Sequence, residues 1–293
     1  MELDRAREAA ARWRPELAGA PAVRYGGGGR SSTLAIGDWL LRFPRRPEVV
    51  DELVREQRVL DAIAPLLPVA VPRSRPVGVL EDGTPFFAHP LIPGEPLDEP
   101  TARLGLVVSQ LAGLLHALHA VPARQVTDLG VPVLDAGATR RWVHETAGRA
   151  VTDVLPLLPG SLRTAAAADW DAILAEVAGW SFAPVVCHGA LYPSNILVQR
   201  GRGVVTGVLG WADVRVGDPA ADLAGIAAAM APGIDLSIAM SYADDDGAAE
   251  LVGRARVMAR ISRYADVLTS AARPERRSAD ATLATLRSQL TAQ

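Results

Sequence analysis

The stretch VVCHGALYPSNILV, residues 185–198, decides the fold of this chain. An apolar run leads into a sharp turn at His188-Gly189, and a second apolar run starts at Ile196. After a short turn, a third apolar run ends in GVLGWAD, residues 207–213. Short apolar runs bounded by glycine, proline and asparagine are typical of buried strands. The pattern therefore predicts strand, tight loop, strand, turn, strand and a second tight loop.

The composition predicts a folded protein that does not bind nucleic acid. The chain has 293 residues, 49% of them hydrophobic, and a formal net charge of −3. Such a length allows two domains or one two-lobed unit, and such a charge argues against nucleic-acid or polybasic membrane surfaces. One cysteine excludes an internal disulfide and argues against a cysteine-based zinc site. Neither a signal peptide nor a membrane-length apolar run is recognisable, so we expect a cytoplasmic protein.

The pattern of the first 92 residues predicts a small lobe of antiparallel strands with one inserted helix. The expected strands are residues 22–25, 32–36, 39–43, 77–80 and 85–91, and the expected helices are residues 2–18 and 49–66. A hinge is expected at Ile92-Pro93-Gly94-Glu95-Pro96, because proline and glycine interrupt regular structure.

Residues 93–293 predict a larger, mainly helical lobe. The expected helices are residues 101–120, 138–155, 161–179, 247–271 and 277–291, and another helix begins at Asp218-Pro219. The segment 185–213 interrupts this helical series. We therefore expect two domains, residues 1–92 and residues 93–293.

Several further segments, together with residues 188–198, resemble the motifs of a known protein family. They are WLLRFPRR (39–46), LHALHAVP (115–122), GWAD (210–213) and GDPAADLA (217–224). In this order they resemble the aminoglycoside phosphotransferase superfamily, and most of all its macrolide phosphotransferase branch. The resemblance implies an α+β fold with two lobes, like that of protein kinases. It also implies ATP or GTP with magnesium as cofactor and a small-molecule natural product as partner.

The chain departs from the family at the two positions that carry the chemistry. The family pattern is His-Gly-Asp-x-x-x-x-Asn, followed by Asp-Trp or Asp-Phe, whereas this chain has Ala190 and Gly210 at the two Asp positions. The resemblance implies that the first Asp accepts a proton from the substrate hydroxyl and that the second binds metal. Alanine and glycine can do neither. We expect the two losses to cost about 5–8 kcal/mol of transition-state stabilisation.

The loop keeps two polar residues of the family motif. His188 corresponds to a family histidine that is mainly structural. Asn195, the only asparagine in the chain, stands at the position of a magnesium ligand. One neutral amide is a poor magnesium site, because magnesium prefers carboxylates and phosphates. Asp218 and Asp222 belong to a segment that supports the loop in the family, although helix capping alone would also explain Asp218.

The resemblance places a nucleotide site in the first lobe. Arg42 stands at the position of the cation that holds phosphate, and the chain has no lysine. A guanidinium group can bind phosphate through two hydrogen bonds. Glu56 is its expected partner, although an exposed arginine and a solvated glutamate are also possible. The other candidates are Gly28, Arg30 and Ser31 in or beside the glycine run, and Pro93 and Gly94 in the hinge.

The sequence constrains the substrate least. Met230, Tyr242 and Tyr264 are candidates for an apolar wall that suits a macrolide, and Asp213 is a further candidate substrate residue. Asp213 follows Gly210 by three residues, about 10 Å of extended chain, so it does not simply replace a metal ligand there. An acidic run at residues 244–246 would suit an aminoglycoside, but solvated loops commonly carry such runs.

Four functions remain open. We favour a pseudokinase that binds a small natural product or a nucleotide. The second is a repurposed enzyme that acts on an antibiotic-like metabolite in a biosynthetic pathway. The third is a macrolide or aminoglycoside O-phosphotransferase inactivated at Ala190 and Gly210. The fourth is a helical adaptor for other proteins. An apolar stripe would mark such an adaptor, but core burial explains the stripe at Val257, Ile261, Tyr264 and Leu268 more simply.

Overall fold

The computed structural model describes residues 3–25, 30–271 and 276–291, which divide into two compact units. Unit 1 is Met1–Val131 with Pro193–Val214, and unit 2 is Pro132–Tyr192 with Arg215–Gln293. The chain passes from one unit to the other within the loop that follows Cys187. Across the described ranges, no helix has the length and apolar character to span a bilayer.

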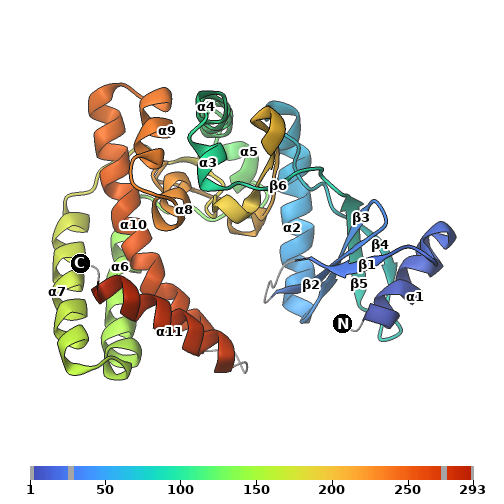
Figure 1. Cartoon of the computed structure of the whole chain (residues 1–293), viewed down its shortest axis with the longest axis horizontal. Coiled ribbons are helices and arrows are strands. Elements are labelled where there is room, and N and C mark those ends of the chain that lie inside the picture. Colours follow the sequence, from blue (N-terminus) through green and yellow to red (C-terminus); the bar gives the residue numbers. More distant parts are fainter. Residues whose placement is uncertain (1–2, 26–29, 272–275, 292–293) are drawn as a thin grey trace. The chain divides into compact units, whose positions relative to one another are not determined.

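A five-stranded antiparallel sheet forms the first part of unit 1 (Figure 1). Its strands are β1 (Ala22–Arg24), β2 (Ser31–Ile36), β3 (Trp39–Pro44), β4 (Arg75–Val79) and β5 (Pro85–Pro90), in the order β1-β2-β3-β5-β4. Helix α1 (Leu3–Trp13) precedes the sheet, and helix α2 (Pro47–Ile63) is inserted after β3. The predicted sheet lobe with one inserted helix is thereby confirmed.

Alternation along β3 assigns one face of the sheet to each helix, since successive side chains of a strand point to opposite sides. Leu41 and Phe43 share a buried cluster with the alanines of α1. Arg42 points to the other face, where α2 supplies Glu56. Helix α1 ends earlier than predicted, because Pro15 cannot continue its hydrogen bonding.

Unit 1 also contains a three-stranded sheet and three helices. The sheet has the order β6-β8-β9, with β6 (Glu95–Pro96), β8 (Ile196–Gln199) and β9 (Val204–Val208). The helices are α3 (Glu99–Ala102), α4 (Gly105–His119) and α5 (Arg124–Thr127). The single helix predicted for residues 101–120 is thus two helices. The shorter one begins before Thr101, whose N–H donates to the capping carboxylate of Asp98 at 3.0 Å.

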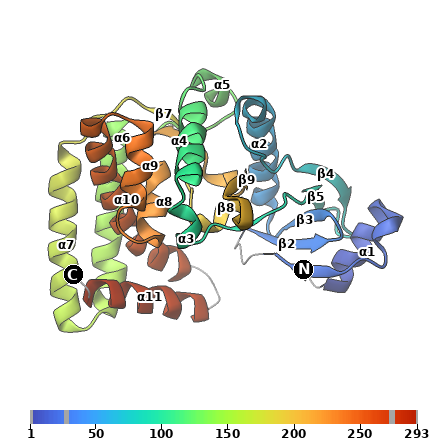
Figure 2. The same ribbon diagram turned by 45° about the horizontal axis from the view of Figure 1, so that its top comes forward.

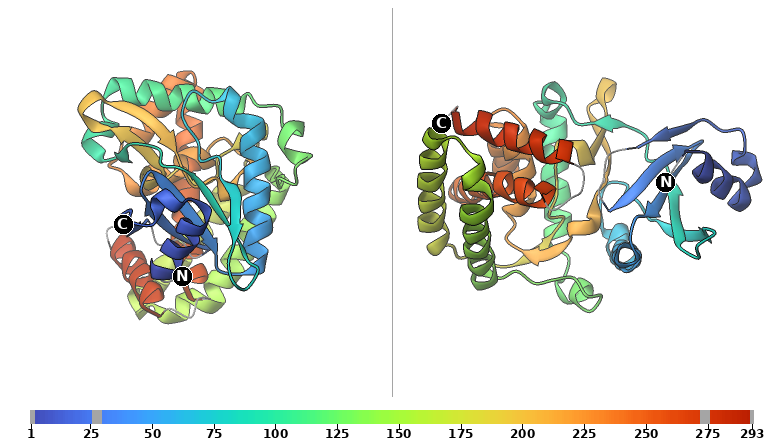
Figure 3. Two further views of the ribbon diagram at one scale, coloured as in Figure 1. Left: turned by 90° about the vertical axis from the view of Figure 1, so that its right-hand side faces the viewer. Right: turned by 90° about the horizontal axis from the view of Figure 1, so that it is seen from below.

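Helices dominate unit 2 (Figures 1 and 2). They are α6 (Ala136–Arg149), α7 (Gly160–Ala178), α8 (Ala221–Ala229), α9 (Ile234–Tyr242), α10 (Asp245–Ala271) and α11 (Arg276–Thr291). Figures 2 and 3 show α6 and α7 side by side, and α10 contacts α6 as well as α8, α9 and α11. The stripe Val257, Ile261, Tyr264 and Leu268 is buried in the core of this unit. That burial removes the only feature that favoured an adaptor.

In the described part of unit 2, β7 (Val185–Cys187) pairs antiparallel with β10 (Arg215–Gly217) in a small sheet. The sequence did not predict β6, β10 or α9, because two or three residues are too few for a strand pattern and α9 is apolar with no distinct face. Residues 93–131 and 193–214 belong to unit 1. The compact units therefore differ from the domains 1–92 and 93–293, which stay a prediction.

Candidate functional site

Arg42 and Glu56 form a two-pronged ion pair in unit 1. Both guanidinium Nη atoms donate to the glutamate carboxylate, and the Nη2–Oε2 distance is 3.1 Å. Glu56 is buried, at 5% exposure, while Arg42 is half-buried. The pair that the sequence predicted fourteen residues apart is thus formed. A guanidinium held in this way is preoriented, with donor capacity left for a further anion.

Arg30 lies between two carboxylates of the same unit. Its Nη2 is 2.9 Å from Asp213 Oδ1, and its Nε is 3.7 Å from Glu52 Oε2. Burial alone would lower the pKa of Arg30, but the charges of Asp213, Glu52 and Glu56 outweigh burial and raise it. Asp213, a candidate substrate residue, therefore serves here as the ion-pair partner of a candidate phosphate-binding arginine.

The other candidate nucleotide-binding residues make no ion pair in the described part of the chain. Gly28 lies outside the described residues. Ser31 is buried, and its Oγ finds no hydrogen-bond partner in the described part of the chain. Pro93 and Gly94 are exposed, and Gly94 has φ +141° with Thr206 Oγ1 2.5 Å from where a Cβ would be. Backbone geometry therefore explains the hinge glycine without a ligand.

Gly210 and Asn195 share one small volume of unit 1. Gly210 has φ +80°, and a Cβ built there would lie 2.6 Å from Asn195 Nδ2. The N–H of Leu209 donates to the backbone oxygen of Asn195 at 2.8 Å. No carboxylate stands at position 210, and the nearby carboxylate of Asp213 is engaged by Arg30. This donor set does not fit magnesium, which favours several oxygen ligands including carboxylates.

In unit 2, a buried carboxylate holds the loop after β7. Asp222, at 0% exposure, accepts the backbone N–H groups of His188 at 3.0 Å and of Gly189 at 2.7 Å. His188 is itself buried, and its Nδ1 lies 3.2 Å from the backbone N of Ala190. These bonds give His188 a structural role and preserve the loop although Ala190 has no functional group.

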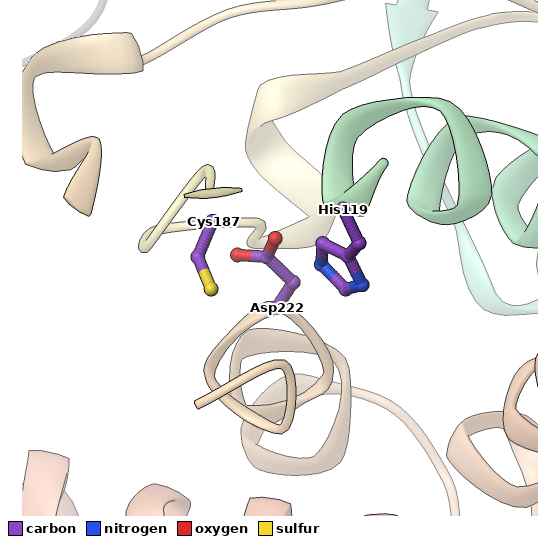
Figure 4. Close-up of side chains that lie close together, drawn as sticks. All are labelled: His119, Cys187 and Asp222. Atoms are coloured by element: carbon purple, nitrogen blue, oxygen red, sulfur yellow. The ribbon is translucent and has the colours of Figure 1, made fainter. Parts of the chain in front are cut away.

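Close packing of α8 completes this support. A Cβ on Gly225 would lie 2.6 Å from the backbone oxygen of Leu191, so only glycine lets α8 approach the loop so closely. Cys187 is fully buried, and burial, followed by the charge of Asp222, raises the pKa of its thiol. Figure 4 shows this thiol and the carboxylate of Asp222; His119, also labelled there, belongs to unit 1. We infer that Cys187 is a packing residue.

A cavity of about 190 Å³ lies beside Ala190, entirely within unit 2. Its wall includes Leu134, Trp142, Ala190, Arg215, Asp218 and Met258. Asp218 is buried and paired with Arg254, whose Nε and Nη2 lie 2.8 and 3.2 Å from its carboxylate oxygens. It also accepts the N–H of Ala220 at 2.9 Å, but this bond lies in the turn before α8, whose N-cap residue is Ala220, so Asp218 does not occupy the N-cap that was predicted for it. The sequence did not single out Trp142 or Arg215, and the only signal for Arg215 is a charge between two valines.

The predicted substrate residues do not line this cavity. Tyr264 is fully buried and donates to Asp169 at 2.9 Å, so the core accounts for it. Met230 borders a separate hollow between α8 and α10. Tyr242 is half-buried, and burial raises the pKa of its hydroxyl. A substrate role for these residues stays a prediction with no support from their placement.

Comparisons with known proteins show which family this chain belongs to. Residues 23–260 match the model of a family described as "Phosphotransferase enzyme family". Viomycin phosphotransferase of Streptomyces vinaceus is 29% identical over 224 residues, which cover 73% of this chain and 76% of that protein. The uncharacterized protein YcbJ of Bacillus subtilis (strain 168) is 27% identical over 198 residues; the match covers 63% of this chain and 60% of the length of YcbJ.

Solved structures resemble the chain over nearly its whole length. The GDP and kanamycin complex of APH(2")-IIIa aligns with a TM-score of 0.85 at 21% identity, covering 99% of each chain. The macrolide 2'-phosphotransferase MphH from Brachybacterium faecium aligns with a TM-score of 0.72 at 26% identity, covering 97% of each chain. The predicted α+β, kinase-like fold with a sheet lobe and a helical lobe is therefore confirmed.

Proposed function

The chain belongs to the phosphotransferase enzyme family, and from this premise we propose that it is a pseudokinase, which binds a small molecule in the cavity of unit 2 without transferring phosphate. The observation that carries the proposal is the cavity beside Ala190. Its wall has no free carboxylate among the described residues, because Asp218, the one carboxylate there, is paired with Arg254. A bound hydroxyl would therefore have no acceptor for its proton.

The metal position supports the same proposal. Gly210 offers no ligand, and Asn195 alone is a poor magnesium site. Nucleotide binding would then rest on the arginines of unit 1, Arg30 and Arg42. We expect Mg-ATP and Mg-GTP at about millimolar concentration to leave the thermal unfolding midpoint unchanged, since a ligand that binds weakly adds little stability.

The names of the relatives suggest which ligand class to test first. They include a viomycin phosphotransferase, a kanamycin complex of an aminoglycoside phosphotransferase, and a macrolide phosphotransferase. We propose a small natural product as the ligand of this chain and a cytoplasmic location for the protein. Both extend the sequence-based predictions.

A phosphate-transfer assay tests the proposal. The protein would be incubated with viomycin, kanamycin or a macrolide in the presence of magnesium and either ATP or GTP, and the products analysed by mass spectrometry. The Streptomyces vinaceus viomycin phosphotransferase serves as the active control. We expect no phosphorylated product above the no-protein background.

Two outcomes would contradict the pseudokinase. Phosphorylated antibiotic that requires the protein would show that transfer proceeds without the two aspartates. A chemically altered antibiotic that carries no phosphate would instead favour the repurposed enzyme.

A further inference from the structure

The cavity beside Ala190 carries an unbalanced positive charge. Arg215 lines it from β10, is half-buried, and makes no hydrogen bond or ion pair with any described residue. The other charged lining residue, Asp218, is neutralised by Arg254, which also contacts Glu250 at 2.6 Å. A half-buried guanidinium without a partner is a ready site for an anion, since it binds a planar carboxylate through two parallel hydrogen bonds.

The alanine at position 190 contributes to the positive charge of the cavity. At position 190 the family pattern has a carboxylate, which in this chain would face the same cavity as Arg215. Alanine removes that negative charge and leaves the arginine unopposed. The substitution that abolishes the expected proton acceptor therefore also makes the cavity suitable for an acidic ligand.

The rest of the wall is mostly apolar. Leu134, Trp142, Ala221 and Met258 contribute to it. A volume of about 190 Å³ exceeds the roughly 150 Å³ of an apolar cavity that accepts benzene. An aromatic or aliphatic group of one or two rings fits this volume.

We propose that the cavity binds an apolar, ring-sized molecule that carries one carboxylate, with the carboxylate paired to Arg215. The proposal rests on the proposed function, because it assumes that this cavity is the binding site. It predicts discrimination against polycations such as aminoglycosides. A polycation would meet the charge of Arg215 and would find no free carboxylate in the described wall.

Two probes of nearly identical shape test the charge preference. The probe 2-naphthoate carries the carboxylate, and 2-naphthamide is its neutral counterpart; kanamycin serves as the polycation. Titration calorimetry on the full chain is expected to show 2-naphthoate binding at least about ten-fold more tightly than 2-naphthamide, since charge-assisted hydrogen bonds are about twice as strong as neutral ones. Kanamycin is expected not to displace 2-naphthoate.

Three variants assign the preference to the cavity. Arg215→Gln is expected to bind both naphthyl probes equally, with 2-naphthamide affinity unchanged. Ala190→Asp is expected to weaken 2-naphthoate selectively. Arg149→Gln, which removes the same charge from an exposed position on α6 outside the cavity, is expected to keep the wild-type preference.

Several results would overturn the proposal. They are equal affinities of the wild type for the two naphthyl probes, a preference that survives Arg215→Gln, tighter binding of kanamycin, and no binding of 2-naphthoate at about millimolar concentration. These failures are distinct from failure of the proposed function. A protein that transfers no phosphate but prefers 2-naphthamide or kanamycin overturns this inference alone, whereas phosphorylated product overturns the pseudokinase.

Discussion

At the residue scale, backbone geometry explains why position 210 holds a glycine. Its φ of +80° is a conformation that costs other residues about 1–2 kcal/mol, and a Cβ there would crowd the amide of Asn195 at 2.6 Å. We predict that Gly210→Ala lowers the free energy of unfolding of unit 1 by about 1–2 kcal/mol. Urea unfolding, followed by a probe in unit 1, measures this change.

Gly113 provides the matched control. It lies inside α4 of the same unit, where a new Cβ would meet nothing within 4 Å. Gly113→Ala is expected to stabilise the unit by about 0.5–1 kcal/mol, because alanine is the better helix former. If Gly210→Ala is as stable as the wild type, the backbone does not require glycine at this position.

Single residues also show where sequence reasoning succeeds and where it stops. Arg42 and Glu56 were predictable as a pair through the family resemblance, which implies a phosphate-holding cation on this strand and its partner on the inserted helix. Arg215 was not predictable, because its three-residue strand leaves no periodic signal. Tyr264 looked like a possible ligand contact, yet an aromatic residue on an apolar stripe belongs to the core, as its bond to Asp169 shows.

At the element scale, buried carboxylates connect the helices of unit 2 to one another and to the loop. Asp222 at the start of α8 holds the loop after β7, and Asp235 in α9 accepts from Arg256 in α10 at 2.8 and 3.2 Å. The sequence predicted a helix starting at Asp218-Pro219, and α8 begins slightly later, at Ala221. Helix α9 was not predicted from the sequence, although Asp235 links it to α10, which was predicted.

Asp235 makes the stability of unit 2 depend on pH. Burial would raise its pKa, but the hydrogen bonds from Arg256 and from backbone N–H groups outweigh burial and lower the pKa. A carboxyl group with a lowered folded-state pKa stabilises the fold above its unfolded value of about 3.9, and that contribution is lost as the pH falls through the folded-state pKa. We predict that Asp235→Asn melts at a lower temperature than the wild type at pH 7, and that the difference shrinks below about pH 4.

Thermal unfolding across this pH range measures both effects. Asp171, exposed on α7 and without a hydrogen-bond or ion-pair partner among the described residues, supplies the control variant Asp171→Asn. Its melting temperature is expected to follow the wild type at every pH. A difference between Asp235→Asn and the wild type that stays constant down to about pH 2 would mean that the ion pair does not couple stability to protonation.

At the scale of the whole molecule, the two positions at which the family pattern has aspartate fall in different units, Ala190 in unit 2 and Gly210 in unit 1. The order of motifs along the chain predicted the fold through the family resemblance, and the hydrophobic patterns and turn residues predicted most of its strands and helices. The sequence predicted the loss of phosphate transfer from Ala190 and Gly210, and this stays a prediction. The positive charge of the cavity depends on which side chains pair, and pairing such as that of Asp218 with Arg254 is visible only in three dimensions.

The double variant Ala190→Asp/Gly210→Asp tests whether the rest of the molecule still suits phosphate transfer. We predict no phosphorylated viomycin, kanamycin or macrolide from it, because a side chain introduced at position 210 would compete with Asn195 for space. The measurement is mass spectrometry after incubation with magnesium and ATP or GTP, and thermal unfolding confirms that the variant folds. The single variant Ala190→Asp separates a folding defect at position 210 from a loss of activity. Phosphorylated product from a folded double variant would mean that the two aspartates were the only losses, and that the cavity still accepts the substrates of the chain's active relatives.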